Sequence, residues 1–201
     1  MIDVGSQVEY EELKFLKGLL DEIPKDKRDN HVFNIGIFKG SSTLVLAEGM
    51  KEYNYSGNLF TVGICRAMGI VAFDYLPMRE RRDVYLNSKS VYEEAVENIT
   101  KYDVTDKIVI HHGFSDSLVL ESCLGNKEIS FVFIDGDHST HGVLLDLLKY
   151  SQNLISGGLI ALHDFPATFV NKAIKIFLDI RPDFHEHNKY KGVLVLRKGS
   201  L

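Results

Sequence analysis

Two hydrophobic patterns alternate along the chain, one typical of helices and one typical of buried strands. Over residues 8–23 apolar positions recur every three or four residues, which predicts an amphipathic helix. Short apolar runs that end at glycine or at polar residues predict strands. On these criteria we expect strands at 31–36, 58–64, 107–112, 129–134, 159–162 and 192–197, and further helices at 42–53, 90–102, 139–153 and 167–179. His185 and His187 alternate around Glu186 as in a strand, and we expect both to face solvent.

Strands that alternate with helices predict a parallel α/β sheet with helices on both faces. We therefore expect one domain over residues 1–201, with an N-terminal helix within 1–29. The segment 65–89 lacks a clear period and is predicted to be a long basic loop, with room for one short helix. Loops of this length often carry function. This loop holds four arginines, which either line an anionic substrate or form a solvated charged surface. They are Arg66, Arg79, Arg81 and Arg82.

The composition is that of a soluble globular protein. The chain has 201 residues, with 28 acidic and 23 basic side chains and a formal net charge of −5. Non-specific binding of nucleic acid needs a basic face, so we expect no nucleic-acid partner. Cys65 and Cys123 are far apart in the sequence and are typical of free thiols in a reducing compartment. The chain shows no signal peptide and no apolar run of about 18 residues, so we expect a cytoplasmic protein without a membrane partner.

Polar residues gather after three of the predicted strands. They form the segments Gly36–Ser42, Asp135–His138 and His163–Asp164. In open α/β sheets the ligand binds outside the carboxyl ends of the strands. Polar residues spread at random over the loops would not favour one end of the strands. The pattern therefore predicts an active cleft at this edge of the sheet.

The first of these segments joins a predicted strand to a predicted helix. Gly36 permits a tight turn, and Gly40 permits a ligand to approach the backbone. The free N–H groups at the start of the helix can bind an anion or a carboxylate. The spacing matches neither the GxxxxGK[ST] nor the GxGxxG pattern of nucleotide sites. The alternative is a turn and a helix cap without a ligand.

The second and third segments combine carboxylates with imidazoles. Asp135, Asp137 and His138 follow one strand, and His163 and Asp164 follow the next strand along the chain. Neighbouring parallel strands lie about 4.8 Å apart, so these side chains can converge on one ion or one substrate atom. Oxygen ligands suit hard divalent cations, and a neutral imidazole can add a nitrogen. The alternative is a capped turn in which Asp137 or Ser139 begins the following helix.

These segments give the chain a family likeness. Asn34–Thr43, Phe133–His138 and Ser156–Asp164 resemble the motifs of class I methyltransferases that use S-adenosylmethionine. Within that family the chain is similar to the small O-methyltransferase-like group related to macrolide sugar methyltransferases and cephalosporin hydroxylases. The resemblance implies a Rossmann-like fold, with a seven-stranded, mostly parallel sheet, helices on both faces and an antiparallel last strand.

The resemblance also implies roles for individual residues. The segment from Gly36 to Ser42 would surround the methionine part of the cofactor, and the segment 112–115 would border its adenine. The implied cofactor residues are Gly36, Phe38, Gly40, Ser41, Ser42, Gly63, Gly113, Ser115 and Asp135. In metal-dependent relatives the positions of Asp135, His163 and Asp164 hold a divalent ion such as Mg²⁺. From the chemistry of their side chains we also expect Asp135, His138 and His163 to be catalytic, through a bound metal or as a general base.

Two positions depart from the family pattern. Relatives commonly carry an acidic residue where Asn34 stands, and another where Gly63 ends the second strand, to hydrogen-bond the ribose of the cofactor. Glycine cannot accept those bonds, and a charged hydrogen bond contributes about 1.5–3 kcal/mol. Asp74 in the long loop is a candidate substitute.

Two functions therefore remain open at this stage. The first is O-methylation of a hydroxyl group on a small molecule or sugar, with either a metal on Asp135 and Asp164 or a histidine base to activate the acceptor. The second is a binding or regulatory module that has kept the fold and lost the cofactor. The helix at 8–23 could cap the sheet or pair with a second copy in a homo-oligomer.

Overall fold

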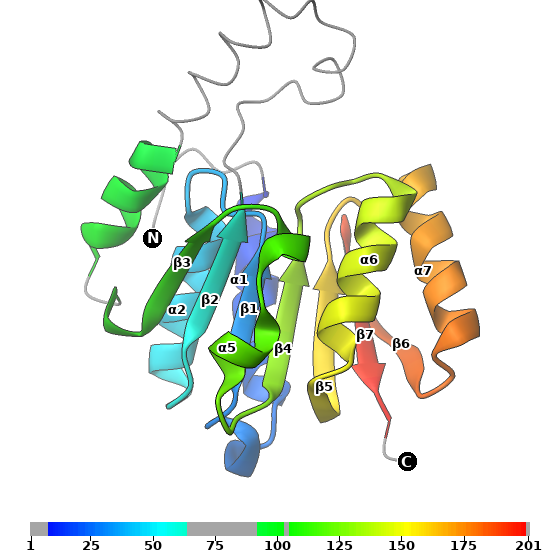
Figure 1. Cartoon of the computed structure of the whole chain (residues 1–201), viewed down its shortest axis with the longest axis horizontal. Helices are drawn as coiled ribbons and strands as arrows, with labels where there is room; N and C mark the ends of the chain where they lie inside the picture. Colours follow the sequence, from blue (N-terminus) through cyan, green and yellow to red (C-terminus); the bar gives the residue numbers. More distant parts are fainter. Residues whose placement is uncertain (1–7, 64–91, 103–104, 200–201) are drawn as a thin grey trace, which may run out of the picture.

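A seven-stranded sheet forms the centre of the protein in the computed structural model, which describes residues 8–63, 92–102 and 105–199 (Figure 1). The predicted loop at 65–89, with its four arginines, Asp74 and Cys65, lies outside the described residues. The strands are β1 (His31–Ile35), β2 (Leu59–Gly63), β3 (Ile108–His112), β4 (Ile129–Ile134), β5 (Leu154–Leu162), β6 (Phe184–Tyr190) and β7 (Val193–Lys198).

The strand order is β3-β2-β1-β4-β5-β7-β6. The first five strands of the chain pair in parallel, while β7 runs antiparallel to both β5 and β6. The prediction of a mostly parallel sheet with an antiparallel last strand is therefore confirmed. Strands β2 and β3 are added on one side of β1, whereas β4 and β5 are added on the other. Because the order of the strands switches between β1 and β4, a crevice is expected there, at the carboxyl ends of the two strands.

Helices cover both faces of the sheet (Figure 1). The helices are α1 (Tyr10–Leu19), α2 (Ser41–Glu52), a helix over 92–100, α5 (Leu120–Leu124), α6 (Thr140–Ser151) and α7 (Thr168–Ile180). Figure 1 shows α6 and α7 in front of the sheet and α1 and α2 behind it. Phe33 packs into the core on the α6 side, and its neighbour Val32 packs into the core on the α1 side. Both faces of the strands are buried, which explains their continuous apolar runs.

Three elements differ from the predictions. β5 begins at Leu154, because Gly157 and Gly158 lie inside the strand as an irregularity rather than in a turn before it. β6 is polar, so the apolar criterion did not include it among the strands; it is held at the sheet edge by pairing with β7. His187 on this strand does not simply face solvent, because its Nε2 lies 2.6 Å from Glu22 Oε2 and the side chain is partly buried. Helix α5 has five residues, too few for a recognisable period.

Among the described residues, no helix is both long enough and apolar enough to cross a bilayer.

Candidate active site at the carboxyl ends of the strands

The loop after β1 lies directly against the end of β4. Gly36 has a φ of 109°, and a Cβ built on it would stand 2.0 Å from the carbonyl oxygen of Asp135. Only glycine fits this position. The Gly36 N–H donates to Val62 O, and the Asp135 N–H donates to Ile35 O. The predicted cofactor loop and the predicted acidic residue are therefore in backbone contact.

The same loop leads into helix α2 with its polar groups turned inward. Gly40 is the N-cap residue, with a φ of 91°, and Phe38 also adopts a positive φ, of 35°. Ser41 and Ser42 form the first turn and are buried. The Ser41 hydroxyl has no hydrogen-bond partner among the described residues. The first N–H groups of a helix also lack partners within the helix, so this turn suits an anionic group.

Asn34 lies beneath this loop and is fully buried. Its Nδ2 donates to Thr43 Oγ1 and Thr61 Oγ1, each at 3.0 Å, and approaches Gly36 O at 3.3 Å. The side chain thus joins β1, β2 and α2. A carboxylate has no N–H to donate to the Gly36 carbonyl, so the neutral amide suits this position better than an ionised acid would.

Gly63 ends β2 next to the cofactor loop. A Cβ built on it would stand 2.9 Å from the Ile37 backbone nitrogen and 3.0 Å from Ile37 Cγ2. An acidic side chain at position 63 would therefore require Ile37 to shift. Gly113 lies beside it at the end of the neighbouring strand, where its N–H donates to Gly63 O at 3.3 Å. Two of the predicted cofactor residues thus adjoin each other at the carboxyl ends of β2 and β3.

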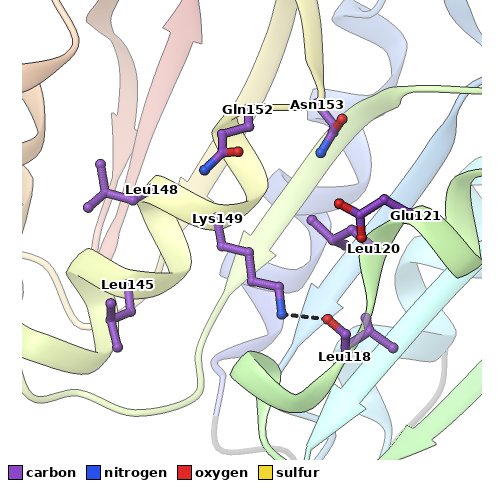
Figure 2. Close-up of a pocket in the computed structure, with 8 residues that line it drawn as sticks. All are labelled: Leu118, Leu120, Glu121, Leu145, Leu148, Lys149, Gln152 and Asn153. Atoms are coloured by element: carbon purple, nitrogen blue, oxygen red, sulfur yellow. Dashed lines mark hydrogen bonds between the residues drawn. The ribbon is translucent and has the colours of Figure 1, made fainter.

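Helix α6 clamps the segment that follows β3. The Ser115 hydroxyl donates to Asp146 Oδ1 at 2.5 Å, and Asp146 is 3% exposed. Lys149 donates to the carbonyl oxygens of Ser115 and Leu118, each at 2.6 Å, and Figure 2 shows its amine reaching Leu118. Burial raises the pKa of Asp146 to about 6, although the hydrogen bond from Ser115 opposes this shift. The sequence analysis did not single out Asp146 or Lys149.

A groove of about 300 Å³ lies on the outer side of this clamp (Figure 2). Its walls are leucines of α6 and of the segment around α5, and its lining residues are Leu118, Leu120, Glu121, Leu145, Leu148, Lys149, Gln152 and Asn153. None of the predicted site residues in the described part of the chain lines it. The groove is therefore separate from the loops at the strand ends.

The loops after β4 and β5 bring two imidazoles and two carboxylates together. His138 lies between the acids, with Nδ1 2.9 Å from Asp164 Oδ2 and Nε2 3.4 Å from Asp135 Oδ1. His163 Nδ1 lies 3.2 Å from Asp135 Oδ1 and 3.4 Å from Asp164 Oδ1. The pairing of β4 with β5 sets Ile134 beside Leu162, so the residues that follow must meet. These four predicted side chains therefore lie together at this edge of the sheet.

The carboxylates favour the charged form of both rings. Hydrogen bonding to Asp135 and to Asp164 raises the pKa of His138 to about 10. Burial opposes a charge on His163, but the contacts with Asp135 and with the other nearby carboxylates outweigh burial and raise its pKa to about 9. In turn, the hydrogen bond from His138 lowers the pKa of Asp164. The cluster as it stands is a network of ion pairs.

The two histidines differ in access. The side chain of His138 is 55% exposed, whereas that of His163 is 13% exposed. Nε2 of His163 faces Glu12 Oε2 on α1 at 3.4 Å. Glu12 was not among the predicted site residues, because it lies 151 positions away in the sequence and occupies one turn of an ordinary amphipathic helix.

One group of side chains could hold a metal ion. Ligand atoms of Asp135, His138 and Asp164 all lie within 4.8 Å of one another. The resemblance names His163 in place of His138, and His163 directs Nδ1 toward the same two carboxylates. The capped turn is also present, since Ser139 is the N-cap of α6 and accepts a bond from the Gly142 N–H. Asp137 accepts a bond from the Ser139 N–H and lies outside the cluster of facing side chains.

Comparison with known families matches residues 33–165 to a methyltransferase domain. This stretch covers about two thirds of the chain and runs from β1 to the loop after β5. It contains all the predicted site residues, and it excludes α1, α7, β6 and β7. A comparison with curated protein sequences found no significant match.

Solved structures share the fold. The O-methyltransferase NovP superposes with a TM-score of 0.75 at 11% identity, over 97% of this chain and 82% of that one. TomG from Streptomyces achromogenes, an O-methyltransferase in complex with SAM, gives 0.65 at 15% identity over 96% and 82%. An O-methyltransferase from Bacillus cereus, in complex with SAH, gives 0.62 at 17% identity over 96% and 84%. At these identities the likeness concerns the fold.

Proposed function

Because the chain belongs to the methyltransferase domain family, we propose that it transfers the methyl group of S-adenosylmethionine to a hydroxyl group of a small molecule or sugar. The observation that carries this proposal is the contact between Gly36 and Asp135. It brings the loop proposed to hold the cofactor to the cluster proposed to receive the acceptor. The structural neighbours that are O-methyltransferases support the choice of oxygen as the acceptor atom.

The residues after β1 fit the methionine end of the cofactor. The buried Ser41 hydroxyl, which lacks a partner among the described residues, and the N–H groups of the first turn of α2 suit its carboxylate. Gly113 and Ser115 are proposed to border the adenine. S-adenosylmethionine carries an already activated sulfonium methyl, so the main contribution of the protein is to align the donor and the acceptor.

We propose that the acceptor hydroxyl binds beside the exposed His138 and passes its proton to the carboxylate of Asp135 as the methyl group arrives, because the raised pKa of His138 leaves that ring already protonated. Two carboxylates and one imidazole also form a reasonable donor set for a divalent cation. Such a cation, when bound, lowers the pKa of a coordinated hydroxyl. The His163 side chain is only 13% exposed and contacts carboxylates through both ring nitrogens, so its proposed role is to support the cluster from within.

A second candidate function is a binding or regulatory module without catalysis. Asn34 and Gly63 favour it, because neither supplies the carboxylate that family members commonly place there. The structure also explains both residues without loss of the cofactor: Asn34 donates a buried hydrogen bond to Thr43, and Gly63 leaves room for Ile37. The two candidates differ in whether the cleft still holds the cofactor.

Calorimetric titration with S-adenosylmethionine and S-adenosylhomocysteine, with and without Mg²⁺, tests the proposal. We expect saturable binding, and release of S-adenosylhomocysteine with at least one acceptor from a set of sugars and small molecules that carry hydroxyl groups. The variant Gly36→Ala should lose binding, since its Cβ would overlap Asp135 O. Gly18→Ala, whose Cβ meets no described heavy atom within 4 Å, is the matched control. Absence of heat at millimolar ligand would favour the second candidate.

A further inference from the structure

A buried carboxylate of the N-terminal helix lies against the candidate active site. Glu12 on α1 is 4% exposed. Its Oε1 accepts the N–H of Gly192 in the β6–β7 turn at 2.8 Å, and its Oε2 accepts the N–H of Glu9 at 3.0 Å. Oε2 also lies 3.4 Å from Nε2 of His163. A buried carboxylate is costly unless it is paired, so these contacts fix where Glu12 lies.

The contact with His163 reaches the cluster through the histidine ring. The ring meets Glu12 through Nε2 and Asp135 through Nδ1, so carboxylates hold it from opposite sides. Phe133 packs edge-on against the ring, with centroids 6.3 Å apart. A carboxylate on the far nitrogen of a histidine commonly fixes the ring orientation and the nitrogen presented to the site.

The neighbouring turn is shaped to allow this contact. A Cβ built on Gly192 would stand 2.9 Å from Glu12 Oε1, so glycine lets the β6–β7 turn close over the carboxylate. Lys191 in the same turn binds Glu9 at 2.6 Å, which ties the start of α1 to the sheet a second time. Both Glu12 and Gly192 lie outside the stretch that matches the family, so the match assigns neither of them a role.

We propose that Glu12 is a positioning residue of the active site: it holds the His163 ring so that Nδ1 faces Asp135, and thereby makes helix α1 part of the catalytic unit. This inference rests on the proposed function. It concerns the orientation of the ring and requires no contact between Glu12 and the substrate or cofactor.

The test compares Glu12→Gln with Glu11→Gln. Glutamine at position 12 keeps the size of the side chain and can still accept the Gly192 N–H, but it loses the charge that faces His163 and the acceptor for the Glu9 N–H. Glu11 is an exposed neighbour on the same helix and serves as the matched control. For each variant the measurements are kcat with the acceptor that gives the highest wild-type turnover, the Kd for S-adenosylhomocysteine, and the His163 ring signals in a long-range ¹H–¹⁵N spectrum, assigned with His163→Gln.

We expect Glu12→Gln to lower kcat by about tenfold or more. Its Kd should stay within twofold of wild type, its His163 signals should move, and Glu11→Gln should match wild type throughout. Unchanged His163 signals would overturn the inference. So would an unchanged kcat, or a loss of kcat matched by an equal loss of cofactor affinity. If the wild-type chain transfers no methyl group, the proposed function fails, and the His163 signals alone then decide whether Glu12 orients the ring.

Discussion

The Nδ1 atom of His138 lies 2.9 Å from Oδ2 of Asp164, and this contact joins the loop after β4 to the loop after β5. Asp164 stands in the left-handed region, with a φ of 59°, a conformation that aspartate tolerates better than most residues. In this conformation the Asp164 carboxylate points along the edge of the sheet toward His138. The ends of the two strands therefore act as one site, which also contains Asp135 and His163.

The shared member of this site is Asp135, which contacts both histidines. We expect Asp135→Ala to lower methyl transfer by at least a hundredfold, in line with the usual contribution of a positioned acid or base. The fold should survive, because the side chain lies at a strand end. Turnover per folded molecule is the measurement, with folding followed by circular dichroism. Asp179→Asn, an exposed position on α7, serves as the control; a near-normal rate for Asp135→Ala would remove Asp135 from the mechanism.

The sequence predicted the central strands well because a strand buried on both faces is an unbroken apolar run. β1 and β4 begin at the predicted residues, and each ends within one residue of its predicted end, next to the candidate site. The edge of the sheet was harder. β6 is polar and gains its order from pairing with β7, and the start of β5 contains two glycines that resemble a turn. In both cases pairing with a neighbouring strand, rather than local pattern, decides the structure.

The same distinction applies to the site. Asp135, His138, His163 and Asp164 could be brought together from sequence because parallel neighbouring strands end at one edge. Glu12 and Asp146 could not be found that way. Each is an acidic residue on an amphipathic helix, and only the packing of that helix shows that it is buried against a distant partner. The one signal that the sequence offered for these two residues was an acidic side chain at the border of the apolar face of a helix.

Asp146 gives the stability of the protein a specific pH dependence. Its pKa is raised from 3.8 to about 6, so between these values the folded state keeps a proton that the unfolded state releases. Stability therefore falls as the pH rises from about 4 to about 6. The groups that face Asp146 are Ser115, Asp116, Asp137 and Lys149.

The variant Asp146→Asn should abolish this dependence. Relative to the variant, wild type should lose up to about 3 kcal/mol of unfolding free energy between pH 4 and pH 6, since one pKa unit corresponds to about 1.4 kcal/mol. Urea unfolding at half-unit pH intervals measures the difference, with Asp179→Asn as the control carboxylate. A difference between wild type and Asp146→Asn that is constant over this range would contradict the raised pKa.

We expect Lys149 to raise the affinity for the cofactor although it does not contact the cofactor itself. Its amine donates to the carbonyl oxygens of Ser115, Asp116 and Leu118 and so holds the segment that is proposed to border the adenine. We expect Lys149→Gln to raise the Kd for S-adenosylhomocysteine about tenfold by loosening this segment. Lys175→Gln, at an exposed position on α7, should leave it unchanged. Equal affinities in calorimetry would show that the clamp is irrelevant to the ligand.

Gly63 should resist replacement even by the smallest side chain. A Cβ there would stand 2.9 Å from the backbone nitrogen of Ile37, inside the cofactor loop. Overpacking of this kind costs about 1–3 kcal/mol. We expect Gly63→Ala to lose that much stability and to bind S-adenosylhomocysteine more weakly, and Gly63→Asp to do no better. The control Gly18→Ala should gain up to about 1 kcal/mol, as alanine does in a helix. Tighter binding by Gly63→Asp would show that only the acid was missing.

The variant Asn34→Asp restores the acidic residue that family members commonly carry at the other departing position. The Nδ2 of Asn34 donates to the buried hydroxyls of Thr43 and Thr61 and approaches the Gly36 carbonyl, which can only accept. In Asn34→Asp a carboxylate would face the Gly36 carbonyl without a proton to offer. Leaving a buried polar group unpaired costs about 1–3 kcal/mol, and more for a charged group.

We therefore expect Asn34→Asp to lose at least about 2 kcal/mol of unfolding free energy at pH 8. The loss should shrink toward pH 5, because burial raises the pKa of a carboxyl group and the protonated acid can donate again. Urea unfolding at the two pH values tests this, with the exposed Asn188→Asp on β6 as the control. If Asn34→Asp were as stable as wild type at pH 8 and bound S-adenosylmethionine more tightly, the buried amide would be a loss of function rather than an alternative support for the cofactor loop.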